Sequence, residues 1–128
     1  MKVLINLVLA SILFVDICSA QSIAEQQDAR VIENLISAGS DISKPHNIDF
    51  FMFMPSKAKA NSAAAEMEHL GYTIASVDRD SAQSQWQIHA TRVMAPQLDA
   101  MTATTRTLES VAAKHGGDYD GWGTGVVE

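Results

Sequence analysis

Four histidines are the residues of this 128-residue chain best suited to metal binding or acid–base chemistry. They are His46, His69, His89 and His115. No two of them are three or four residues apart, so a zinc site would need distant segments to converge. The sequence therefore predicts no metal site and no cofactor. His115 is expected at a helix end, where it would interact with the helix dipole, and His89 is expected to be a satisfied surface residue.

Motifs for nucleophilic catalysis and for phosphate binding are missing from the sequence. It contains no G-x-S-x-G elbow, no Walker loop and no dinucleotide-binding fingerprint. Its glycines near Trp122 follow a helical pattern, whereas a phosphate cradle opens a helix. Asp78, Arg79 and Asp80 fall at a predicted strand-to-turn junction, where such side chains are usually solvated. We therefore predict that the protein is not an enzyme and has no catalytic residues.

The closing segment, "GGDYDGWGT" (116–124), combines acidic, aromatic and glycine residues and is the candidate binding site. Its candidate binding residues are Asp118, Tyr119, Asp120, Gly121 and Trp122. Read as a regular strand, it places Asp118, Asp120 and Trp122 on one face and Tyr119 and Gly121 on the other. Glycines beside a tryptophan also permit a bulge or a positive φ. Either Trp122 fills the core, or Trp122 and Asp120 form a recognition surface. We expect the ring to be buried and Asp120 to lie near the surface.

The elements that must position this segment follow from hydrophobic periodicity and from glycine and proline breaks. Helices are expected over 26–38, 56–70 and 96–115, and strands over 46–54, 72–80, 86–94 and 118–128. The order α-β-α-β-β-α-β predicts an α+β, ferredoxin-like fold: a βαββαβ sandwich with a four-stranded antiparallel sheet, preceded by an extra N-terminal helix. Phe51 and Phe53 make the second sheet face apolar, so the extra helix is expected to cover that face or an edge.

Residues 1–20 have the pattern of a secretory signal peptide. Lys2 precedes an apolar run from Val3 to Val15, and the small residues Cys18-Ser19-Ala20 follow. We expect cleavage after Ala20, which leaves residues 21–128 as a single domain without cysteine. The predicted location is periplasmic or secreted, or cytoplasmic if the segment is not a signal.

The charge of the chain bears on its partners. The net charge is −6, and removing residues 1–20 leaves it unchanged because Lys2 and Asp16 are the charged residues there. A negative protein is repelled by the phosphate backbone, so the sequence argues against nucleic-acid binding. It favours a basic protein partner. No membrane association is expected after cleavage, and homodimerisation stays open.

The closing motif (116–124) resembles the end of the RraB family, regulators of ribonuclease E activity, whose members carry a near-identical Y-D-G-W-G-T run after their last helix. The order of elements also agrees with the family's ferredoxin-like domain. The resemblance implies a non-enzymatic protein that inhibits ribonuclease E by binding it. This chain differs in its predicted export and in lacking a strongly acidic tail after Glu128.

Two other functions are compatible with the residues. An exported acidic protein could act as an immunity protein that neutralises a toxin in the periplasm. Alternatively, Phe51, Phe53, Ala75 and Val77 could line a small-molecule or metal-binding site on the open sheet face.

Overall fold

The computed structural model describes residues 21–80, 82 and 84–128, so the predicted signal peptide, residues 1–20, lies outside the described residues. The elements, in chain order, are α2 (Ile23–Ser37), β1 (His46–Met54), α3 (Lys57–His69), β2 (Thr73–Asp80), β3 (Gln85–Met94), α4 (Leu98–Lys114) and β4 (Asp118–Gly123). This is the predicted order, with β4 ending earlier than expected. Leu98 rather than Pro96 begins the last helix.

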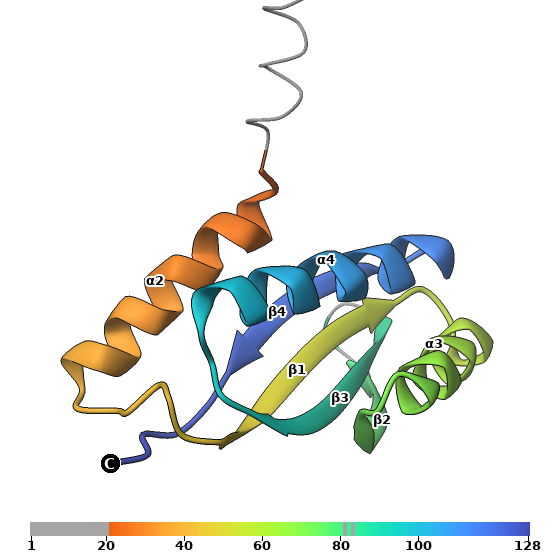
Figure 1. Ribbon diagram of the computed structural model, residues 1–128. Helices are drawn as coiled ribbons and strands as arrows, with labels where there is room; N and C mark the ends of the chain where they lie inside the picture. Colours follow the sequence, from red (N-terminus) through yellow and green to blue (C-terminus); the bar gives the residue numbers. More distant parts are fainter. Residues whose placement is uncertain (1–20, 81, 83) are drawn as a thin grey trace, which may run out of the picture.

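The four strands form one antiparallel sheet in the order β2-β3-β1-β4 (Figure 1). In this order β1 is central and pairs with both β3 and β4, whereas β2 and β4 are the edge strands. Each helix after β1 connects two parallel strands that have an antiparallel strand between them, as in the split β-α-β units of a ferredoxin-like fold. The predicted fold class is confirmed.

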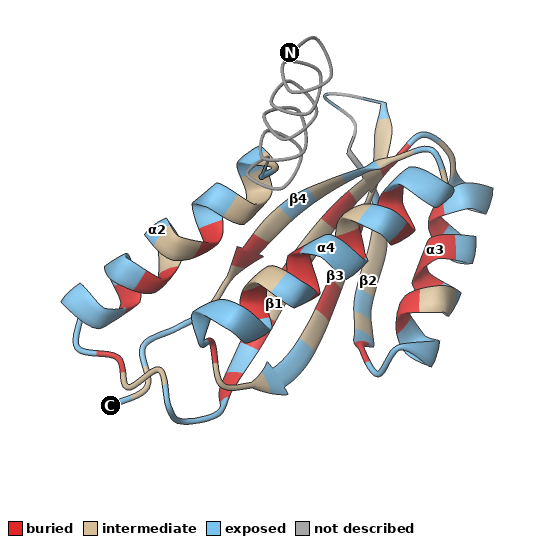
Figure 2. Cartoon of the chain, turned by 45° about the horizontal axis from the view of Figure 1, so that its top comes forward, coloured by how far each residue is buried: buried red, intermediate tan, exposed pale blue. Residues whose placement is uncertain are grey.

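All three described helices lie on the same side of the sheet (Figure 2). α4 crosses the middle of this side, α3 contacts β2 and β3, and α2 lies alongside α4 and over β4. The extra helix therefore covers the β4 edge, one of the two expected positions. No described helix covers the second face of the sheet, which we call the open face.

The core lies between the helices and the sheet. β1 sends Ile48, Phe50, Met52 and Met54 towards the helices, and none of the four side chains is exposed. Burial of such a strand side chain stabilises the fold by roughly 1.5–3 kcal/mol. The small residues of α3 face these strand residues and allow the helix to approach the sheet closely. They are Ala60, Ala63 and Ala64.

α2 begins earlier than the sequence indicated, because its first turn is capped. The hydroxyl of Ser22 accepts a hydrogen bond from the amide of Glu25, and its backbone adopts the extended conformation of an N-cap. Ser22 also donates to Glu109 on α4, and Glu25 forms an ion pair with Arg106 at 2.7 Å. These contacts hold the first turn against α4, so the helix starts before residue 26, where the sequence predicted it to begin.

In the part of the chain that the structure describes, no helix combines the length and the hydrophobicity needed to cross a bilayer.

Candidate protein-binding surface

The closing motif contains a β-bulge, and the bulge decides where its aromatic residues point. Phe51 pairs with Gly121, but the next residue of β1, Met52, pairs with Tyr119, so Asp120 is an extra residue. Gly121 has a φ of +104°, a conformation that a residue with a side chain rarely adopts. Tyr119 and Trp122 are three residues apart and would lie on opposite faces of a regular strand. The bulge brings both onto the helix side, so the regular-strand reading is wrong, whereas the bulge and positive φ that the glycines were expected to permit are both present.

Trp122 is a core residue with a defined polar partner. Its side chain is 9% exposed, and its indole Nε1 donates to Oδ1 of Asp28 on α2 at 2.8 Å. The hydroxyl of Thr105 on α4 donates to the same oxygen at 2.9 Å. Asp28 therefore joins α2, α4 and β4 at one buried point. The sequence reasoning missed Asp28; the Ser22-x-x-Glu25 capping pattern would have placed it within a helix.

The buried carboxyl of Asp28 is only partly compensated. Its Oδ2 has no hydrogen-bond partner, and neither has the buried hydroxyl of Tyr119. Burial raises the pKa of Asp28 above its usual range, although the hydrogen bonds from Trp122 and Thr105 oppose the rise. Burial also raises the pKa of Tyr119. Asp28 is therefore harder to ionise in the folded protein than in the unfolded chain.

We expect Asp28→Asn to raise the melting temperature at neutral pH. A carboxyl with a raised folded-state pKa weakens the fold as the pH rises through the window between its unfolded and folded pKa values. Asparagine carries no charge and keeps an oxygen for Trp122 and Thr105. The gain should disappear at a pH below the unfolded value of about 3.9. Thermal unfolding of both proteins at neutral and acidic pH measures this, with the exposed Asp120→Asn as control. An equal loss of stability at both pH values would contradict it.

We expect Gly121→Ala to lower the free energy of unfolding through backbone strain alone. A Cβ at this position would meet no atom within 4 Å, so there is no steric clash to add. A non-glycine residue in a sparsely populated region of φ/ψ costs about 1–3 kcal/mol. Urea unfolding checks the value. Unchanged stability would show that the bulge does not depend on this glycine.

The five candidate binding residues thus divide between the core and the surface. Tyr119 and Trp122 lie towards the helices, as expected for Trp122. Asp118 and Asp120 are exposed, and Gly121 lies on the open face opposite Phe51. The motif therefore does not form a surface centred on Trp122, and its outward part belongs to a larger surface.

That larger surface is the open face. The strand positions that point to it follow from the register, because paired residues share a face. They include Asp49, Phe51 and Phe53 of β1, Ser76 and Asp78 of β2, Gln87, His89 and Thr91 of β3, and Asp118, Gly121 and Gly123 of β4. None of these positions carries a lysine or an arginine. Val77 pairs with the buried Ile88 and faces the helices, so it does not line the predicted small-molecule surface with Phe51, Phe53 and Ala75.

A polar and aromatic cluster occupies the middle of the open face. Nε2 of His89 lies 2.7 Å from Oδ1 of Asp49, and both side chains are partly exposed, by 31% and 40%. The rings of His89 and Phe51 are stacked, with 4.9 Å between their centroids and 18° between their planes. As predicted, His89 is satisfied by a neighbour. Together the three side chains present an apolar ring beside a carboxylate, a combination suited to contact with another protein.

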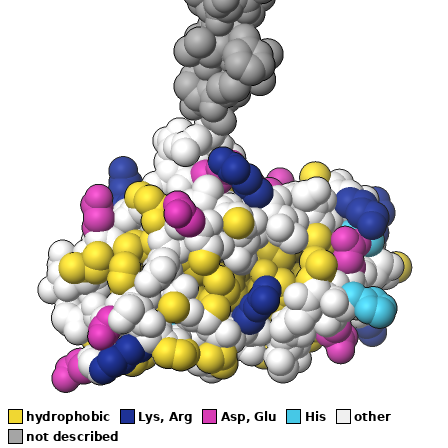
Figure 3. All heavy atoms as spheres, viewed as in Figure 1, with side chains coloured by type: hydrophobic (Ala, Val, Ile, Leu, Met, Phe, Trp, Pro, Cys, Tyr) yellow, Lys and Arg dark blue, Asp and Glu magenta, His cyan; other side chains and the backbone are white. Residues whose placement is uncertain are grey.

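The side of the molecule that carries the helices, opposite the open face, has basic as well as acidic side chains (Figure 3). Figure 3 shows lysine and arginine side chains spread among acidic and hydrophobic ones on the side that carries the helices. Several of these charges are paired within the chain. Glu66 of α3 accepts from Lys114 and from His115 at the end of α4, and the hydrogen bond from His115 is the main reason that the pKa of Glu66 is lowered. The ring of His115 thus links two helices, in addition to its expected position at a helix end.

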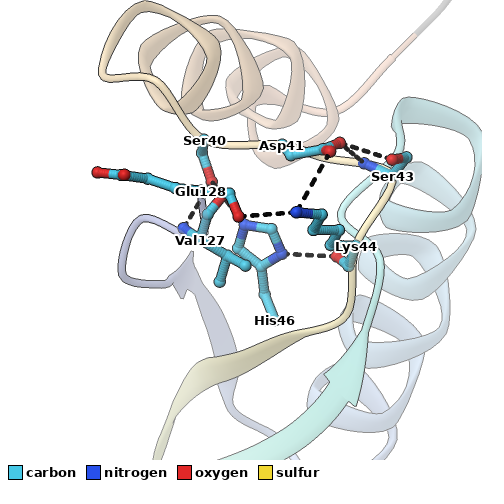
Figure 4. A network of polar contacts seen from close by, with 7 residues as sticks. All are labelled: Ser40, Asp41, Ser43, Lys44, His46, Val127 and Glu128. Atoms are coloured by element: carbon cyan, nitrogen blue, oxygen red, sulfur yellow. Dashed lines mark hydrogen bonds and ion pairs between the residues drawn. The ribbon is translucent and has the colours of Figure 1, made fainter.

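A second buried polar cluster fixes the C-terminal segment (Figure 4). Nδ1 of His46 lies 2.8 Å from the carbonyl oxygen of Lys44, and its Nε2 lies 2.6 Å from Oγ of Ser40. Ser40 Oγ in turn accepts from the amide of Val127. A serine hydroxyl beside an imidazole could suggest a nucleophile. Here both side chains are buried and the hydroxyl is hydrogen-bonded to the backbone, so the pair stabilises the fold.

Residues 21–80, 82 and 84–128 contain no group of three or more histidine, cysteine, aspartate or glutamate side chains placed to hold a metal ion.

A family model and several relatives match most of this chain. The sequence model of the family described as regulator of ribonuclease activity B matches residues 25–124. A protein of that name from Pseudoalteromonas atlantica is 27% identical over 100 residues, which cover 76% of this chain and 86% of the relative. Proteins of the same name from Xenorhabdus nematophila and Actinobacillus succinogenes are 26% and 25% identical, over 77% and 78% of this chain and 72% of each relative. The chain belongs to the family of regulators of ribonuclease activity B.

Proposed function

We propose that this protein is a non-enzymatic regulator that binds another protein through the open face of its sheet. The observation that carries the proposal is the aromatic and acidic character of a face that no described helix covers. Phe51 and Phe53 are half-buried there without a covering layer. Aromatic side chains beside polar ones are typical of the centre of a protein–protein interface.

The charge of the face favours a protein over a nucleic acid. A sheet with exposed aromatic rings is a common platform for single-stranded RNA, but such platforms combine the rings with basic side chains. Asp49, Asp78 and Asp118 point to the open face, and its strand positions carry no lysine or arginine. This negative charge attracts a basic protein segment, whereas it repels a phosphate backbone.

The relatives named as regulators of ribonuclease activity make a ribonuclease the first partner to test. We expect residues 21–128 to slow RNA cleavage by purified ribonuclease E, and Thr91→Arg to abolish the effect. Thr91 lies on the open face beside Asp49, where a guanidinium would occupy that carboxylate. Thr107→Arg is the matched control, because Thr107 is exposed on α4. Inhibition that survives Thr91→Arg and is lost in Thr107→Arg would contradict the proposed face.

We also propose that the chain is exported, on the strength of the pattern in residues 1–20. The protein purified from its host should then have the intact mass of a chain that begins at Gln21. A full-length chain in the cytosol would contradict export and would leave ribonuclease E accessible as the partner.

Export would favour a second function, because a periplasmic protein does not meet a cytosolic ribonuclease. In that case the acidic open face suits an immunity protein that covers a basic surface of a toxin. A gene for a secreted toxin beside the gene for this protein would support it. Binding of that toxin by the wild type and not by Thr91→Arg is the expected result.

A further inference from the structure

The ring of Phe51 has one free face. His89, its neighbour on β3, stacks against the ring with the two planes nearly parallel. Adjacent strands are about 4.8 Å apart, so this stacking runs across the strands. The second face of the ring therefore points the other way, towards β4. There the paired residue is Gly121, which has no side chain to cover it.

The uncovered area continues along β4. Gly123 pairs with Asp49, two residues from Phe51 on the same face. A Cβ built on Gly121 or on Gly123 would meet no atom within 4 Å, so the space above both residues is open. Because two glycines lie where side chains would otherwise stand, β4 leaves a bare strip beside an aromatic ring. We call Gly121, Gly123 and the free side of Phe51 the glycine strip.

Carboxylates lie at both ends of the glycine strip. Asp49 is next to Gly123, and its side chain is 40% exposed, with one oxygen on His89. Asp118 is exposed at the other end, opposite Phe53. A group that stacks on Phe51 is thus flanked by two acceptors and by no lysine or arginine from the strand positions of this face. Planarity, donors and positive charge are the properties that such a group needs.

We infer that the glycine strip binds an arginine side chain of the protein partner. A guanidinium is flat, so it can stack on the free side of Phe51, and its donors diverge in the plane towards carboxylates on either side. An ammonium of lysine is compact and strongly hydrated and gains less from the ring. The inference rests on the proposed function, because it names the chemistry with which the open face recognises its partner.

Amide chemical shifts of residues 21–128 test the site without the partner. The probe is the peptide acetyl-Gly-Arg-Gly-Arg-Gly-amide, compared with its lysine analogue. We expect the arginine peptide to shift Phe51, Gly121 and Gly123 and to bind about fivefold more tightly than the lysine peptide. Equal binding of the two peptides, or shifts scattered over acidic residues of the helices, would overturn the inference.

A pair of glycine variants shows whether the open space itself is needed. Gly123→Val fills the glycine strip, and φ at Gly123 is not positive, so the backbone accepts a side chain there. It should weaken binding of the arginine peptide about fivefold or more. Gly125→Val is the control, because its Cβ also meets open space but lies beyond β4. Unchanged binding in Gly123→Val would overturn the inference, whatever its stability.

The arginine inference and the proposed function can fail independently of each other. If the protein does not bind a partner at all, the peptide can still stack on Phe51, and only the proposed function fails. If Thr91→Arg blocks the partner but the peptide shows no arginine preference, the open face remains the binding surface and the arginine inference fails.

Discussion

Trp122→Ala is expected to lower the free energy of unfolding by roughly 3–5 kcal/mol, because it empties a large part of the core. Trp122 is buried on the helix side of β4 and contributes one of the two hydrogen bonds to Asp28. A domain of this size has only about 5–15 kcal/mol in total. Much of the variant should therefore be unfolded at 37 °C. Urea unfolding followed by circular dichroism gives the value.

Trp122→Phe shows how much of the lost stability comes from the hydrogen bond to Asp28 and how much from the lost side-chain volume. Phenylalanine keeps an apolar ring but removes the indole donor and leaves Asp28 with the hydrogen bond from Thr105, which should cost about 1–3 kcal/mol. An unchanged unfolding midpoint in Trp122→Ala would contradict the core position of this ring. It would restore the alternative in which Trp122 belongs to a recognition surface.

The second large effect is expected at Gly117, which lies where the end of α4 meets the end of β1. A Cβ on this residue would overlap the carbonyl oxygen of Phe53 and the sulfur of Met54. The carbonyl belongs to the central strand and Met54 is fully buried, so neither can move away freely. We expect Gly117→Ala to cost about 3 kcal/mol, as overpacking at a rigid site does. The same urea titration measures it.

Gly125→Ala is the matched control, since its Cβ meets no atom within 4 Å. It should change the stability by less than about 0.5 kcal/mol. If Gly117→Ala is as stable as Gly125→Ala, the close approach of the backbone to β1 is not required.

The fold could be predicted from the sequence because each element carries a local signal. Alternation in 46–54 identified β1 and the residues that it buries, and Gly39 and Gly71 mark the ends of two helices with positive φ. Local signals could not decide whether α2 covers the open face or an edge of the sheet. Phe51 and Phe53 make the open face partly apolar, which suggested that α2 would cover it. Instead, α2 packs on α4 and Trp122.

The site was harder to predict, because its geometry depends on long-range pairing. Asp120-Gly121 indicated that a bulge was permitted, but the register with Phe51 and Met52 decides that Tyr119 and Trp122 share a face. Asp28 and Trp122 are 94 residues apart, and so no local pattern connects them. The pairs Asp49–His89 and Ser40–His46 likewise depend on strand register and on the course of a loop.

Site-specific photo-crosslinking shows directly whether the open face contacts the protein partner. A benzoyl-phenylalanine at Phe53 would lie on the open face, and one at Ser110 would lie exposed on α4. Both variants are mixed with ribonuclease E, or with the periplasmic extract if the chain is exported, and then irradiated. Binding through the open face predicts a protein adduct from position 53 and none from position 110. An adduct from position 110 alone would contradict binding through the open face.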